Sequence, residues 1–130
     1  MAETIELEIV TPERQLVREA VTDVQIPGRD GYLGILPGHA ALLGILGTGS
    51  LYYSAGGRKK YLAIQGGFLE VLPDHVRVLA EIAEPAEEID VARAKADLIG
   101  AEAEETGADP ESALKAVALA QARIETATHV

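Results

Sequence analysis

The sequence predicts an α+β protein: an N-terminal antiparallel β-sandwich of about ten strands, followed by a C-terminal antiparallel α-helical hairpin. Three observations predict it. All five aromatic residues and most glycines precede Pro85. In that first part, apolar and polar residues alternate with the period of a strand. After it, the chain is rich in alanine and has no aromatic residue. We therefore expect two domains, a sandwich over residues 1–86 and a hairpin over residues 87–130.

The strands of the first domain are expected where alternation runs between turn signals. Ile5, Leu7 and Ile9 face one side, while Glu6 and Glu8 face the other. The run from Val17 to Ile26 repeats this pattern, and further strands are expected at Ser50–Ser54, Lys60–Gln65, Phe68–Leu72 and Val76–Ile82. Glycine, proline and aspartate separate them, which is typical of short strands in a sandwich or a flattened barrel.

The second domain is expected to form two helices. Asp90 can cap the first, which reaches about Glu105, and Gly107 provides a left-handed stop. Asp109 and Pro110 can begin the second, which reaches about Thr126. The apolar seam is thin, with Val91, Ala94 and Leu98 on the first helix and Leu114, Val117 and Ile124 on the second. Alanine favours helix but buries little area, so we expect this hairpin to form readily and dock weakly.

Composition excludes several classes of function. The chain has 11 basic and 21 acidic residues, and its net charge of −10 repels nucleic acid. It has no cysteine, which excludes disulfides and thiolate metal sites, and its three histidines are scattered.

Residues 31–57 carry no charge, but Pro37 and repeated glycines would break a membrane-spanning helix. Residues 1–6 lack the pattern of a signal peptide, so none is expected. No catalytic motif is present, and pairs such as Glu87 and Glu88 are expected on solvated surfaces.

Three motifs in order resemble those of the bacterial F-type ATP synthase epsilon subunit. They are Gly31-Tyr32-Leu33-Gly34-Ile35-Leu36-Pro37-Gly38-His39-Ala40-Ala41-Leu42, Ile64-Gln65-Gly66-Gly67-Phe68-Leu69-Glu70-Val71 and Ile89-Asp90-Val91-Ala92-Arg93-Ala94. The resemblance covers nearly the whole chain. It implies a non-catalytic rotor subunit whose sandwich sits against the gamma subunit and the ring of c subunits. It also implies a hairpin that can extend toward the catalytic alpha/beta head and inhibit ATP hydrolysis, on the cytoplasmic face of the bacterial inner membrane.

The resemblance also suggests where partners bind. The turn Arg29-Asp30-Gly31-Tyr32 is the face offered to the c-ring, and His39 is a further candidate for the c-ring and gamma interface. Family members often carry glutamate where this chain has Tyr32. A structural interpretation stays open, in which the glycines and Pro37 form tight turns and His39 bonds to the backbone.

A nucleotide site is the other implication. Some bacterial members bind ATP through a motif that Ile89, Asp90, Arg93 and Ala94 match here, with Arg123 as a supporting cation. The alternative function is therefore an ATP-sensing module whose hairpin folds around the nucleotide. Phosphates need several charge-assisted donors, and this chain offers few, so we expect no required cofactor and at most weak regulatory ATP binding. In the simpler interpretation, Asp90 caps a helix and Arg93 pairs with Glu88 or Asp97. A sandwich adaptor unrelated to the synthase is a third alternative.

Overall fold

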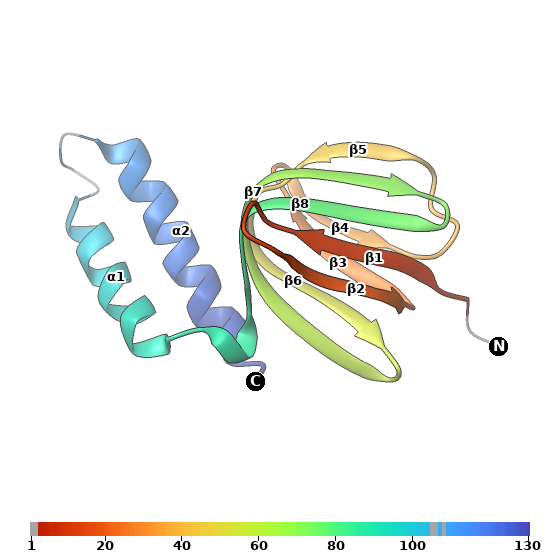
Figure 1. Ribbon diagram of the computed structural model, residues 1–130. Coiled ribbons are helices and arrows are strands. Elements are labelled where there is room, and N and C mark those ends of the chain that lie inside the picture. The colour runs from red at the N-terminus through yellow and green to blue at the C-terminus, as the bar shows by residue number, and fades with distance from the viewer. Residues whose placement is uncertain (1–2, 105–106, 108) are drawn as a thin grey trace.

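The computed structural model describes residues 3–104, 107 and 109–130. The predicted helix end at Glu105 lies outside them. The described residues form eight strands, one 3₁₀ helix and two α-helices (Figure 1). These are β1 (Ile5–Val10), β2 (Gln15–Val21), β3 (Asp23–Gly28), β4 (Gly31–Ile35), β5 (Leu42–Ile45), β6 (Thr48–Ala55), β7 (Arg58–Leu72), β8 (His75–Pro85), η1 (Ala86–Glu88), α1 (Val91–Glu104) and α2 (Pro110–Ala127).

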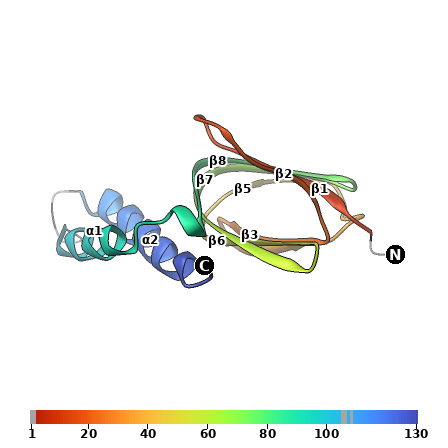
Figure 2. The same cartoon turned by 60° about the horizontal axis from the view of Figure 1, so that its bottom comes forward.

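The strands form one sheet that folds over on itself. Their order is β2-β1-β8-β7-β6-β3-β4, and β5 pairs with the second half of β7. Figure 2 shows the sheet curling into a flattened barrel, with the hairpin beside it. All pairs are antiparallel except β1 with β8, which is parallel. The predicted sandwich followed by a helical hairpin is therefore confirmed, with one parallel pair that the alternation did not indicate.

The expected number of about ten strands is too high for the described residues, which form eight, and the boundaries of some strands differ as well. β7 runs through Gly66 and Gly67 without losing its register against β8. Both glycines have positive φ, +72° and +113°, which lets the strand turn from one layer of the sandwich into the other. A Cβ atom at Gly67 would lie 2.0 Å from the carbonyl oxygen of Leu79. The pair therefore allows a bend and close packing, and it is not a bulge. Conversely, the expected run from Val17 to Ile26 divides at Thr22 into β2 and β3.

The core lies between the layers and follows the predicted alternation. Ile5, Leu7 and Ile9 are fully buried, while Glu6 and Glu8 are only half-buried. The other large side chains that are fully buried include Val21, Val24, Ile26, Ile35, Leu51, Ile64, Leu69, Val71, Val76 and Val78. This core is almost entirely aliphatic and β-branched.

The hairpin begins with the predicted caps. The Asp90 carboxylate accepts a hydrogen bond from the Arg93 backbone N–H (3.0 Å), and Asp109 accepts one from Ser112 N–H (3.2 Å). The helices meet mainly through alanines, and the buried members of the hairpin are Ala94, Ala101, Ala113, Val117, Ala120, Ala122 and Thr126. Leu114, expected in the seam, is 57% exposed instead. α2 packs against β6, β7 and η1, while α1 lies on its outer side (Figure 1).

Candidate functional site

The turn predicted to face a partner joins β3 to β4. Arg29 and Asp30 at its tip are exposed and form a loose ion pair, with 3.8 Å between Nε and Oδ1. The Arg29 backbone N–H donates to the carbonyl of Ile45, which ties the turn to the end of β5. Gly31 has φ +137°, a conformation that side chains disfavour. The turn is therefore a rigid, charged projection.

Tyr32 is tethered as well as exposed. Its side chain is 51% exposed, yet its hydroxyl accepts a hydrogen bond from the backbone N–H of Ser50 in β6 (3.2 Å). A Cβ on Gly49 would collide with that hydroxyl, so the glycine makes room for it. The ring lines a small pocket with Glu125 and other residues near the end of α2. Tyr32 consequently presents a fixed aromatic face.

His39 lies at the other end of β4 from this turn, in the loop that leads into β5. Its backbone N–H donates to Leu36, and its Nδ1 lies 2.7 Å from the carbonyl of Ala40. The loop is fastened to the β7–β8 turn through Gly38 N–H and the carbonyl of Pro73. The turn at residues 29–32 and His39 therefore do not meet; they flank the two ends of β5.

Between them lies an apolar surface that the sequence analysis missed. On its outward side, Phe68 of β7 is 63% exposed and stands between its cross-strand neighbours Ile45 of β5 and Leu79 of β8. Leu43, also on β5, is 78% exposed. We call Leu43, Ile45, Phe68 and Leu79 the apolar face. A hollow of about 300 Å³ adjoins Phe68 and Leu79, and it is lined further by Val10, Thr11, Pro12, Gly67, Ala80 and Glu81.

The alternation contains a signal for this face. In β7, Leu69 and Val71 point into the core, so Phe68, Glu70 and Leu72 must point outward. Large apolar side chains at outward positions mark a surface that another protein covers. Arg77 pairs with Glu8 and Glu70 at 3.5 Å each and gives the face a charged rim.

The docked hairpin closes another part of the sandwich through polar and aromatic contacts. The Thr126 hydroxyl donates to Ser50 Oγ at 2.9 Å, and both side chains are buried. At the far end of α2, Gln65 Nε2 donates to the carbonyl of Lys115. The docked position is therefore specified by directional bonds rather than by a large apolar contact.

Stacking extends this junction to the end of the chain. The ring of His129 lies parallel to that of Tyr61, with 3.8 Å between centroids. Tyr61 in turn packs against Tyr52 at 5.5 Å. The C-terminal end of α2 thus rests on aromatic rings of β6 and β7.

The predicted nucleotide residues converge at the base of the hairpin. Asp90, Arg93, Ala94 and Arg123 line one pocket of about 310 Å³, whereas Ile89 does not line it. Glu84, Glu88 and Asp97 complete the lining. Four carboxylates therefore face two guanidinium groups in the lining, and Arg14 neutralises one of the four from outside, so phosphates would enter a field that stays negative.

Ion pairs in this pocket differ from those expected. Arg123 bonds Glu84 of β8 (Nε to Oε1, 2.5 Å) and lies 3.9 Å from Asp97 of α1. Glu88 pairs with Arg14 at 2.6 Å. The predicted pairing of Arg93 with Glu88 or Asp97 is therefore wrong, because long-range partners take both carboxylates.

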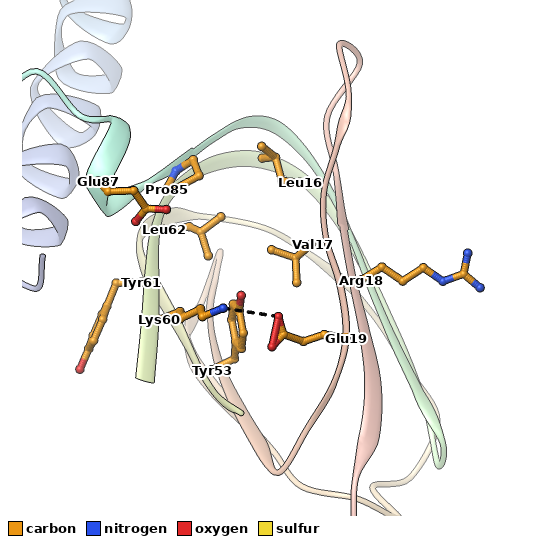
Figure 3. Close-up of a pocket in the computed structure, with 10 residues that line it drawn as sticks. All are labelled: Leu16, Val17, Arg18, Glu19, Tyr53, Lys60, Tyr61, Leu62, Pro85 and Glu87. Atoms are coloured by element: carbon orange, nitrogen blue, oxygen red, sulfur yellow. Dashed lines mark ion pairs between the residues drawn. The ribbon is translucent and has the colours of Figure 1, made fainter. Parts of the chain in front are cut away.

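A further cavity of about 580 Å³ opens at the side of the sandwich, between β2 and the β6–β7 layer (Figure 3). An ion pair between Lys60 and Glu19 (3.7 Å) bridges it, while Arg18 points away into solvent. Tyr53 lies at its inner wall, and burial, followed by the charges of Glu19 and Glu87, raises the pKa of its hydroxyl to about 12. Tyr53 therefore stays protonated at neutral pH.

Among the described residues, no helix is long and apolar enough to cross a membrane. No three of their histidine, aspartate and glutamate side chains are grouped so as to hold a metal ion.

Comparison with known proteins gives a consistent family. The family described as "ATP synthase, Delta/Epsilon chain, beta-sandwich domain" matches residues 4–86. The ATP synthase epsilon chain of Solibacter usitatus is 58% identical over 131 residues, covering 98% of each chain. That of Koribacter versatilis is 57% identical over 95 residues, covering 73% of this chain and 67% of its own.

Two solved structures share the fold of this chain. A chain in the Euglena gracilis mitochondrial ATP synthase (OSCP/F1/c-ring) superposes with a TM-score of 0.84 at 28% identity, over 97% of this chain and 82% of its own. A chain in the Tetrahymena thermophila central stalk/c-ring assembly has a TM-score of 0.62 at 16% identity, over 92% and 96%, and shares the fold. The chain therefore belongs to the ATP synthase epsilon chain family, as a non-catalytic subunit of that enzyme.

Proposed function

We propose that this chain is a rotor subunit that couples the gamma subunit to the c-ring and restrains ATP hydrolysis through its hairpin. The single observation that carries the coupling role is the apolar face. Its four side chains lie on three adjacent strands and are between 45% and 78% exposed. Full burial of a fully exposed side chain of this size contributes about 1.5–3 kcal/mol. Covering these partly exposed side chains contributes a share of that each, so this face suits a permanent partner.

The predicted interface residues fit around this face. His39 precedes the Leu43 end of β5, and the turn at Arg29 is bonded to the Ile45 end. We assign the apolar face and His39 to gamma, and the charged turn at residues 29–32 to the c-ring. An aromatic anchor flanked by polar groups is a common arrangement at the centre of an interface, and Phe68 provides it here.

The regulatory role is assigned to the hairpin. Its buried residues are mainly alanines, so undocking exposes few large apolar side chains. We propose that the undocked hairpin extends toward the alpha/beta head and blocks hydrolysis there. The complex would place this chain peripherally, on the cytoplasmic face of the bacterial inner membrane.

The second candidate is ATP sensing, and it needs ATP as a regulatory ligand, whereas the rotor role needs no cofactor. The observation in its favour is that Asp90, Arg93, Ala94 and Arg123 line one pocket. The excess of carboxylates there disfavours phosphates, which limits the expected affinity. Calorimetry of the full chain with ATP distinguishes the two: tight binding supports sensing, and no heat supports the rotor role alone.

Co-purification with gamma tests the main proposal. We expect Phe68→Glu to abolish capture by gamma without unfolding the chain, because Phe68 is largely exposed. Ile99→Glu is the matched control, since Ile99 is 70% exposed on α1, away from the apolar face. Loss of capture for Phe68→Glu alone supports the proposal. Equal capture of both variants, or none by the unmodified chain, overturns it.

A further inference from the structure

Arg123 joins the sandwich to both helices of the hairpin. It projects from α2, bonds Glu84 in β8 at 2.5 Å, and lies 3.9 Å from Asp97 in α1. Its side chain is 25% exposed, and those of Glu84 and Asp97 are 31% and 48% exposed. These pairs are partly shielded from water, which makes them stronger than fully exposed ones.

The surroundings explain why this arginine is held firmly. Glu84, Glu88, Asp90 and Asp97 line its pocket, with Arg93 as the other cation. Without Arg123, docking would bring Glu84 close to the acidic start of the hairpin with no cation bonded to it. Arg123 therefore both attracts the hairpin and cancels a repulsion that docking would otherwise create.

The same contacts place two carboxylates beside the Arg123 guanidinium, one hydrogen-bonded to Nε and one 3.9 Å from a terminal nitrogen. A nucleotide's phosphates would compete with these carboxylates for the guanidinium, inside a field with excess negative charge. The carboxylates already provide what phosphates would offer to this arginine. The carboxylates that neutralise Arg123 in the docked state therefore belong to the chain itself.

We propose that Arg123, with Glu84 and Asp97, is a salt-sensitive latch that holds the hairpin docked without any nucleotide. The proposal deepens the regulatory role given above and rests on it for its effect on hydrolysis. The docking itself is a property of the isolated chain. Opening the latch releases the hairpin, so local ionic conditions and competing anions, rather than ATP binding, set the docked population.

The absence of cysteine allows docking to be measured directly in the full chain. Labels at Ala20→Cys on β2 and Ala103→Cys on α1 replace exposed, uncharged residues of the two domains. The distance between paired spin labels separates docked from undocked molecules. We expect Arg123→Gln to lower the docked-to-undocked ratio by about fivefold or more, the effect of losing roughly 1 kcal/mol.

Two further variants make the measurement specific. Arg93→Gln removes the same charge from the same pocket, but Arg93 has no ion pair among the described residues, so we expect a smaller change. The reversal Arg123→Glu with Glu84→Arg should restore docking that Arg123→Glu alone loses. Equal effects of Arg123→Gln and Arg93→Gln, or no recovery in the reversed pair, would overturn the latch.

The last two tests vary the salt concentration and add ATP. Raising salt from 0.1 M to 1 M shortens the screening length from about 10 Å to about 3 Å, so the docked population should fall in the unmodified chain and much less in Arg123→Gln. Millimolar ATP should leave the unmodified chain docked to the same extent. A docked population that needs ATP, or that ignores salt, contradicts the latch. Neither result affects capture by gamma, so the latch and the rotor proposal fail separately.

Discussion

The hydroxyl of Thr126 in α2 donates a hydrogen bond to Ser50 Oγ in β6, and it is the buried polar contact between hairpin and sandwich. The two oxygens are 2.9 Å apart, and Thr126 and Ser50 are 0% and 6% exposed. Because both side chains are buried, each hydroxyl has the other as its partner in the docked state. This bond therefore fixes where α2 rests along β6.

Removing one hydroxyl of this pair should cost more than removing both. Thr126→Val leaves the Ser50 hydroxyl buried without its partner, so we expect docking to weaken by about 1–3 kcal/mol. Ser50→Ala combined with Thr126→Val should be closer to neutral. The labelled chain described above measures each variant. Thr128→Val is the control, since the Thr128 hydroxyl bonds only within its own helix, to Glu125. Strictly additive effects would show that the bond does not set docking.

Two glycines should respond in opposite ways to alanine. Gly67 has φ +113°, and a Cβ there would lie 2.0 Å from the Leu79 carbonyl oxygen, so Gly67→Ala should lower the free energy of unfolding by several kcal/mol. Gly100 lies within α1 with open space around it, and Gly100→Ala should gain about 1 kcal/mol of helix stability. Urea unfolding, followed by fluorescence for the sandwich and circular dichroism for the helix, measures both. A tolerated Gly67→Ala would contradict the close strand crossing.

The sequence predicts those parts of the fold that depend on residues close together in the chain, and it misses those that depend on residues far apart. Alternation identified β1, and side-chain capping identified Asp90 and Asp109, because both depend on neighbouring residues. The merging of two expected strands into β7 was not predicted, because the bend at Gly66 depends on the opposite layer of the sheet. The parallel pairing of β1 with β8 was not predicted for the same reason, because it joins segments that lie far apart in the sequence.

The candidate site shows the same division. The motif placed Asp90, Arg93 and Ala94 near one another, as one helical turn requires. That Arg123 would be taken by Glu84, 39 positions away, follows only from the docking of α2. The apolar face was missed for a different reason: Phe68 was taken as part of an apolar strand, although its neighbours Leu69 and Val71 already occupy the inward positions.

Alkaline pH should destabilise the sandwich through Tyr53. Burial and the charges of Glu19 and Glu87 raise the pKa of its hydroxyl to about 12 in the folded chain, against about 10 when unfolded. The folded state therefore holds its proton more tightly. This contribution is complete below pH 10 and is lost between pH 10 and 12. The free energy of unfolding, measured against pH, should fall more steeply for the unmodified chain than for Tyr53→Phe. Parallel curves would show that Tyr53 is not protected in the folded chain.

The last prediction concerns a chain shortened to residues 1–86. The core of the sandwich lies wholly within these residues, and the cut keeps Ala86, whose side chain is 4% exposed. The buried residues of the hairpin are mainly alanines, which add little to that core, so the shortened chain should unfold cooperatively and still be captured by gamma. It loses the Arg14–Glu88 and Glu84–Arg123 ion pairs, which are partly exposed and should lower its Tm only modestly.

In the reconstituted complex, the shortened chain should leave proton coupling largely intact and raise ATP hydrolysis, because no hairpin remains to reach the catalytic head. The latch predicts the opposite effect on hydrolysis for a variant of the full chain. Arg123→Gln in the full chain releases the hairpin and should lower hydrolysis, whereas removal of residues 87–130 should raise it. Thermal unfolding of the shortened chain and ATPase assays of both complexes make the comparison. An unfolded shortened chain would contradict the two-domain architecture. Unchanged hydrolysis in both complexes would remove the inhibitory role and leave the coupling role in place.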